Sequence, residues 1–189
     1  CTIQSLILGK CIFISNNNLF NSLHTLHIRN CYFYDFVDYL PINLKCLYFW
    51  QGFNSDISNL PKSLRCLELG SDFNQPIKKL PQTLKYLDIG HKFNQKITKL
   101  PQLQYLKLGN KFNKSTGKLP NSLISLILGD KYVKQLKLSN TNILYLKVGY
   151  KFNSILQLPN LLKYLYLYEH FNQDIILPKS LIYFTFQDG

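Results

Sequence analysis

A Leu-Pro dipeptide recurs about every 20 residues between Leu40 and Leu177, and a short apolar segment follows each copy. The residue after the last apolar position of each segment serves as a register mark. Successive marks lie 19 to 21 residues apart, at Gly9, Arg29, Trp50, Gly70, Gly90, Gly109, Gly129, Gly149, Tyr168 and Gln187. A fixed period of this length is the signature of a repeat array. We therefore predict one repeat domain of about ten 19–21-residue units over residues 1–189.

The most regular units read Leu-Pro-x-x-Leu-x-x-Leu-x-Leu-Gly-x-x-Phe-Asn-x-x-Ile, as residues 60–77 and 80–97 nearly do. Apolar residues spaced by two predict a short strand with one apolar face. Because that face can be buried only against the next unit, the strands must stack in parallel around a leucine core. Twenty residues leave no room for a full helix, and Pro and Gly punctuate the rest of each unit. The predicted fold class is a mainly β solenoid with little or no helix on its convex side.

The pattern resembles the leucine-rich repeat, and more closely its FNIP subfamily, on the residues Phe73-Asn74-Gln75-Pro76-Ile77. The unit is shorter than the usual FNIP repeat, and its Asn lies two places later than in the usual leucine-rich repeat. The resemblance implies parallel strands on a concave face and an origin in social amoebae or large DNA viruses of protists. The Phe-Asn pair recurs at Phe53, Phe73, Phe93, Phe112, Phe152 and Phe171.

Many proteins of this family carry an F-box, which these 189 residues lack. The resemblance therefore implies the substrate-recognition part of an F-box ubiquitin-ligase adaptor. It also implies a cytoplasmic protein, in the host cytoplasm if the source is viral. The bound protein, of the host or of the virus, stays unknown.

In a solenoid, each slot of the repeat forms a column, so chemistry is sought by column. The Phe column is predicted to be a stacked core spine, and the Asn column to satisfy turn backbone. Side chains on the outer face of the strands form the usual binding surface of such arrays. Tyr supplies large contact area at low entropic cost there, so we predict a protein-binding strip. Its residues are Tyr48, Glu68, Tyr86, Asp88, Tyr105, Lys107, Tyr145, Lys147, Tyr164, Tyr166 and Tyr183. The alternative is that stacked rings only stabilise neighbouring strands.

The formal net charge is +12, from 22 basic and ten acidic residues. Of the basic residues only Arg29 and Arg65 are Arg, and the abundance of Lys, Asn, Ile, Tyr and Phe is typical of AT-rich genomes. A polyanion site usually recruits Arg, so nucleic-acid or membrane-surface binding is the alternative and is not favoured. It would use two Lys columns, namely Lys92, Lys111, Lys131 and Lys151, and Lys79, Lys99, Lys118 and Lys137.

Catalytic patterns are absent from the sequence, because the four His and ten carboxylates match no nucleophile, metal or phosphate-loop spacing. We predict no enzyme activity and no cofactor. Cys1, Cys11, Cys31, Cys46 and Cys66 include no C-x-x-C pair, so free thiols in a reducing compartment are expected. No apolar run is long enough to span a membrane, and no signal peptide is visible.

The ends of the array lack an evident polar cap. The chain has no Met, begins at Cys1 inside a repeat and stops at Gly189 just after the tenth predicted strand. Open ends expose strand edges and apolar core. We expect capping residues outside this sequence, and homodimers or end-to-end self-association without them.

Overall fold

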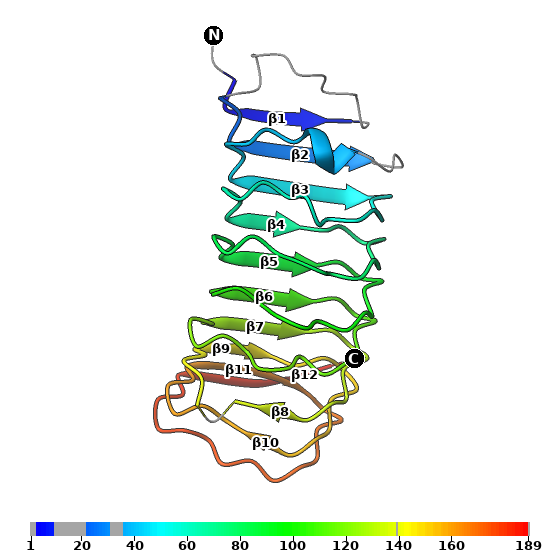
Figure 1. Ribbon diagram of the computed structural model, residues 1–189. Helices are drawn as coiled ribbons and strands as arrows, with labels where there is room; N and C mark the ends of the chain where they lie inside the picture. Colours follow the sequence, from blue (N-terminus) through cyan, green and yellow to red (C-terminus); the bar gives the residue numbers. More distant parts are fainter. Residues whose placement is uncertain (1–2, 10–21, 31–35, 139, 189) are drawn as a thin grey trace.

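Parallel strands are stacked one above another along the whole computed structural model, which describes residues 3–9, 22–30, 36–138 and 140–188 (Figure 1). These residues form a ten-stranded parallel sheet whose strands follow the chain order. Its members are β1 (Ser5–Leu8), β2 (Thr25–Asn30), β3 (Cys46–Gln51), β4 (Cys66–Glu68), β5 (Tyr86–Ile89), β6 (Tyr105–Leu108), β7 (Ser125–Leu128), β9 (Tyr145–Lys147), β11 (Tyr164–Tyr168) and β12 (Tyr183–Gln187). The predicted mainly β, leucine-rich-repeat-like solenoid is confirmed.

The return path of each repeat runs over the other side of the stack. In the described part of the chain it contains one 3₁₀-helix, Phe36–Tyr39, and a two-stranded parallel sheet of β8 (Leu136–Lys137) and β10 (Leu156–Gln157). The helix falls in the aromatic stretch 32–39, whose first four residues lie outside the described ranges. Figure 1 shows β8 and β10 on the face opposite the large sheet.

Leucine columns form the core between the two sides. In register, Leu26, Leu47, Leu67, Leu87 and Leu106 pair along neighbouring strands, and all are fully buried. Each such side chain packs against its equivalents above and below, so burial depends on stacking and not on a single repeat.

A phenylalanine spine runs beside the leucines. From Phe53 to Phe171, stacked rings follow one another at centroid distances of 5.9 to 6.2 Å. Strands of a sheet are only about 4.8 Å apart. The repeats are therefore closer together at the sheet than at the spine, as expected if the sheet lines the concave side.

Side-chain ladders satisfy the turns. The Asn54 Oδ1 accepts the backbone N–H of Asn74 at 2.8 Å, and the same bond links Asn74 to Asn94 and Asn94 to Asn113. At the strand entrance, the Thr83 hydroxyl donates to the Lys62 and Leu64 carbonyls. The Asn column is thus structural, as predicted, and it repeats in every well-formed unit.

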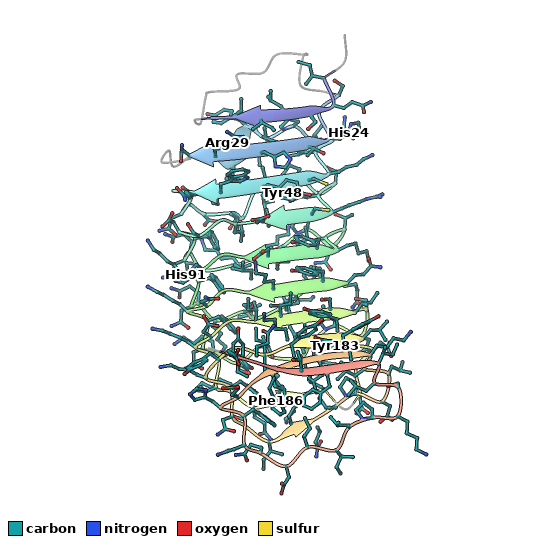
Figure 2. The ribbon with its side chains drawn as sticks, turned by 180° about the vertical axis from the view of Figure 1, so that it is seen from behind. His24, Arg29, Tyr48, His91, Tyr183 and Phe186 are labelled. Carbon is teal, nitrogen blue, oxygen red and sulfur yellow. The ribbon has the colours of Figure 1, made fainter. Side chains whose placement is uncertain are left out.

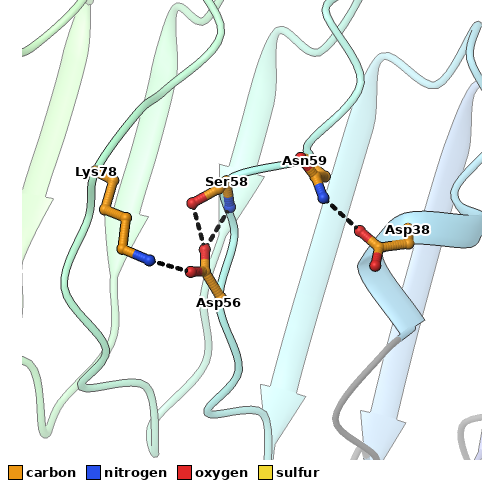
Figure 3. A network of polar contacts seen from close by, with 5 residues as sticks. All are labelled: Asp38, Asp56, Ser58, Asn59 and Lys78. Carbon is orange, nitrogen blue, oxygen red and sulfur yellow. Dashed lines mark hydrogen bonds and ion pairs between the residues drawn. The ribbon is translucent and has the colours of Figure 1, made fainter.

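Polar contacts also join adjacent repeats on the convex side (Figure 3). The Lys78 ammonium lies 2.7 Å from the Asp56 carboxylate, which also accepts from the N–H and hydroxyl of Ser58. These bonds, that of Lys78 first, lower the pKa of Asp56 to about 2. Asn59 donates to Asp38 at 2.7 Å, which ties the 3₁₀-helix to the next repeat.

Candidate functional site

The outer face of the ten-stranded sheet presents two side chains per strand, because successive residues of a strand point to opposite sides. Figure 2 shows this face from the front, with Tyr48 near one end and Tyr183 near the other. The strand register aligns Tyr86 with Tyr105, and Tyr145 with Tyr164 and then Tyr183. All eleven residues predicted for the protein-binding strip belong to these two columns. We call this set the tyrosine strip.

The middle of the tyrosine strip is an aromatic pair beside an ion pair. The rings of Tyr86 and Tyr105 stack at 4.3 Å, nearly parallel. At the next outward-facing position of the same two strands, the Lys107 ammonium lies 2.8 Å from the Asp88 carboxylate. The Asp88 side chain is only 9% exposed, whereas that of Lys107 is 45% exposed. Burial lowers the pKa of Lys107, but the bond and charge of Asp88 outweigh this effect and raise it.

Glu68 adds a second carboxylate to this centre. It is the strand neighbour of Asp88, and no ion pair to it is found among the described residues. Burial, and next the charge of Asp88, raise the pKa of Glu68, while Lys107 acts in the opposite direction. The centre therefore holds two carboxyl groups and one ammonium, and that ammonium is paired with Asp88.

A second aromatic cluster lies toward the C-terminal end. Tyr166 is 5.1 Å from Tyr145 and 5.4 Å from Tyr183, measured between ring centroids. The Lys147 ammonium lies 5.8 Å from the centre of the Tyr168 ring. Tyr164 and Tyr183 are 39% and 47% exposed. Strand β7 separates this cluster from the middle pair, because it contributes only Ser125 and Ile127 to the outer face.

The N-terminal end of the tyrosine strip is bordered by side chains that were not among the predicted binding residues. His27 stacks on Tyr48 at 4.5 Å, and the Arg29 guanidinium lies 5.0 Å from the centre of the Trp50 ring. Both pairs join β2 to β3. The repeat period aligns these residues in columns, but only the structure shows that their side chains are in contact. Trp50 lies near the end of β3 and is 51% exposed, so it extends the aromatic surface toward the carboxyl end of that strand.

Cys46 and Cys66 are free thiols on neighbouring strands. Burial, followed by Cys46, raises the pKa of Cys66 to about 11, so its thiol stays protonated and weakly nucleophilic at neutral pH. Cys1, Cys11 and Cys31 lie outside the described residues. Within the described ranges, no group of three or more His, Cys, Asp or Glu side chains is placed to hold a metal ion.

Fold and surface together define a parallel β solenoid of the leucine-rich-repeat type with aromatic side chains on its outer sheet face. Residues 53–92 and 73–111 match the FNIP repeat. The chain therefore contains FNIP repeats over residues 53–111. No curated protein matches it. Nor do the described residues include a helix long and apolar enough to cross a membrane.

A solved structure shares this fold. The chain is similar to CroV588 of Cafeteria roenbergensis virus, described as a novel circular leucine-rich-repeat protein, with 36% sequence identity and a TM-score of 0.76. The match covers 89% of this chain and 28% of CroV588. This chain therefore corresponds to under a third of that protein.

Proposed function

We propose that the protein binds a partner protein through the tyrosine strip. The observation that carries the proposal is the combination on one face of partly exposed, stacked Tyr rings with two neighbouring carboxyl groups, the buried Asp88 and the half-buried Glu68, beside a single Lys. Tyr and Trp dominate the energetics of protein interfaces, because they bury much area with few rotatable bonds. An array of parallel repeats is the usual support for such a surface.

The chemistry of the centre indicates what the partner presents. Glu68 shares Lys107 with Asp88 and lacks a cation of its own in the described residues, so a Lys or Arg of the partner would neutralise it. Burial, and next Tyr105, raise the pKa of Tyr86, which keeps its hydroxyl neutral as donor and acceptor. The expected partner segment is extended, with a basic side chain over Glu68 and apolar side chains over the flanking rings.

A pull-down from lysate of a protist host tests the surface. The variant Tyr86→Ala/Tyr105→Ala/Tyr145→Ala removes the rings, and Ile155→Ala/Ile176→Ala removes exposed apolar side chains outside the tyrosine strip, which are 64% and 91% exposed. We expect a specific partner to be lost with the first variant and kept with the second, with circular dichroism showing both folded. Identical sets of captured proteins for wild type and the Tyr variant would contradict the proposal.

A finer proposal follows from the family. The tyrosine strip would then be the substrate-recognition part of an F-box ubiquitin-ligase adaptor that acts in the cytoplasm. Ubiquitin conjugation of the captured partner in cells tests this role, and it should rise with the wild-type protein and not with the Tyr variant. An unchanged level would leave the protein as a binding scaffold without a ligase role.

A further inference from the structure

A second surface lies at the edge where the strands end, away from the tyrosine strip. It is a groove of about 620 Å³ lined by alternating lysines and asparagines of consecutive repeats. We call it the lysine-asparagine groove. Its lining residues are Asn54, Asp72, Asn74, Lys92, Asn94, Lys111, Asn113 and Lys131.

Backbone bonds fix the lysines in register. Backbone hydrogen bonds between neighbouring repeats continue past the end of each strand. The N–H of Lys111 donates to the His91 carbonyl at 3.0 Å, and that of Lys131 donates to the Asn110 carbonyl at 3.0 Å. Lys151 repeats the contact with the Asp130 carbonyl at 2.9 Å. The lysine backbones therefore recur at one position per repeat, and their exposed side chains leave from there.

Hydrogen bonds to the backbone fix the orientation of the asparagine side-chain amides. Each Oδ1 faces a backbone N–H of the next repeat, at 2.8 to 3.0 Å for Asn54, Asn74 and Asn94 and 3.2 Å for Asn113. Only the oxygen of an amide accepts a hydrogen bond, so the NH₂ group must point the other way. None of these four NH₂ groups donates to an acceptor among the described residues. The groove is thus lined with aligned donors.

Charge in the groove is positive. Three lysines face one carboxylate, Asp72, so the lining carries about 3 − 1 = +2 at neutral pH. Asp72 lies 2.7 Å from Lys92, and it also accepts the Gly52 N–H at 2.8 Å. Those bonds, that of Lys92 first, lower the pKa of Asp72 to about 2. Lys111 and Lys131 make no ion pair within the described part of the chain.

We propose that the lysine-asparagine groove binds the phosphodiester backbone of an extended single-stranded nucleic acid. Two successive repeats each offer an ammonium and an amide NH₂, Lys92 with Asn94 and Lys111 with Asn113. Asn54 and Asn74 on one side and Lys131 on the other extend this row, and the adjacent Phe rings place the step between repeats at 5.9 Å. That step suits successive phosphates of an extended strand, whose oxygens are pure acceptors and match a surface made of donors. No aromatic ring lines the groove, so bases are not stacked there and binding is independent of sequence.

Fluorescence anisotropy of a labelled oligothymidylate of about ten nucleotides tests the groove. The variant Lys111→Gln/Lys131→Gln removes the two unpaired groove lysines. Its matched control, Lys99→Gln/Lys118→Gln, removes the same charge from the column before the Leu-Pro turn. At about 50 mM salt we expect the groove variant to bind about tenfold more weakly than wild type and the control about as tightly. All these lysines are exposed, so both variants should keep the wild-type melting temperature.

Salt dependence separates specific from diffuse binding. Each lost phosphate contact reduces the slope of log K against log salt by about 0.7, so the groove variant should lose about 1.4 and the control about zero. Equal losses for both variants would assign binding to net charge and overturn the proposal, as would undetectable binding by wild type. Inorganic polyphosphate binding more tightly than the oligonucleotide would overturn the assignment to nucleic acid. The tyrosine variant described above should bind the oligonucleotide normally, which keeps this test independent of the protein partner.

Discussion

At the residue scale, Tyr132 stands out in the aromatic spine because it carries a hydroxyl into an apolar column. Its side chain is fully buried between Phe112 and Phe152. The hydroxyl has no hydrogen-bond partner in the described structure. Burial raises the pKa of Tyr132, and the nearby Thr116 hydroxyl offsets this in part without reaching bonding geometry. A buried unpaired hydroxyl costs about 1–3 kcal/mol.

Replacing Tyr132 by Phe should therefore stabilise the protein. We expect the free energy of unfolding to rise by about 1 kcal/mol, because the ring stack is kept and the unpaired hydroxyl is removed. Chemical denaturation measures the change. Phe93→Tyr is the reciprocal control and should destabilise by a similar amount. A loss of stability in Tyr132→Phe would mean that the hydroxyl does have a partner in solution.

Glu68 makes stability depend on pH in the opposite sense to most carboxylates. Its pKa is raised in the folded state, so the folded protein holds this proton more tightly than the unfolded chain, whose Glu has a pKa of 4.5. The charged form thus destabilises the fold above the folded pKa, and this cost disappears as the pH falls below 4.5. We expect Glu68→Gln to raise the melting temperature at pH 7, with a gain that shrinks toward pH 4. A gain independent of pH would show that charge is not its cause.

At the scale of the repeat, close packing between neighbouring turns requires glycine at several of the register marks. A Cβ on Gly90 would collide with the carbonyl of Gly70, and one on Gly109 with the carbonyl of Gly90. The same clash recurs at Gly129 and Gly149, whereas a Cβ on Gly9 would meet nothing within 4 Å. Consecutive turns are stacked backbone against backbone at these glycines, which leaves no room for a side chain.

The pair Gly109→Ala and Gly9→Ala isolates this effect. Both substitutions add one methyl group at the same slot of the repeat. We expect Gly109→Ala to lower the free energy of unfolding by about 1–3 kcal/mol, because the backbones must move apart, and Gly9→Ala to change it little. Thermal and chemical unfolding measure both. Equal effects at the two positions would argue against backbone stacking as the reason for glycine.

The sequence was sufficient for the fold because each slot repeats. The period predicted the parallel strands, the leucine core and the Phe and Asn ladders, since stacking forces equivalent residues together. It missed the hydroxyl ladder that includes Thr83. Its signal was a Ser or Thr before the first leucine of five units, at Ser22, Ser63, Thr83, Ser122 and Ser180. Strands β8 and β10 were also missed, because two-residue strands carry no periodicity. The Asp88–Lys107 pair and the donor-lined groove depend on side-chain orientation, which a column alone does not define.

At the scale of the whole molecule, the two sides of the stack differ in chemistry. The outer face of the large sheet carries aromatic rings around an acidic centre, while the edge beyond the strands carries lysines at one per repeat. Both surfaces run along the solenoid axis, with a step of about 4.8 Å between strands at the sheet and of 5.9 Å between Phe rings at the spine. An extended ligand on one surface would therefore not need to block a ligand on the other. The repeat thus presents two linear surfaces of different chemistry on one core.

The outer edge of the last strand of the sheet, β12, is a third exposed surface. β12 pairs with β11, and no strand within the described ranges pairs with its other edge. Phe186 occupies a core slot there yet is 47% exposed, and Ile182, just before the strand, is 67% exposed. An unpaired strand with apolar side chains is a template for pairing with another chain.

We therefore expect the polypeptide of residues 1–189 to self-associate through β12. Phe186→Lys places a charge in the core slot of the edge strand, which opposes pairing while costing little burial, since the ring is already half exposed. Light scattering across a range of concentrations should show a larger mass for wild type and a monomer for this variant. Ile155→Lys, an equally charged change at a residue 64% exposed on the convex side, should behave like wild type. A monomeric wild type at high concentration would mean that the twist of β12 already protects its edge.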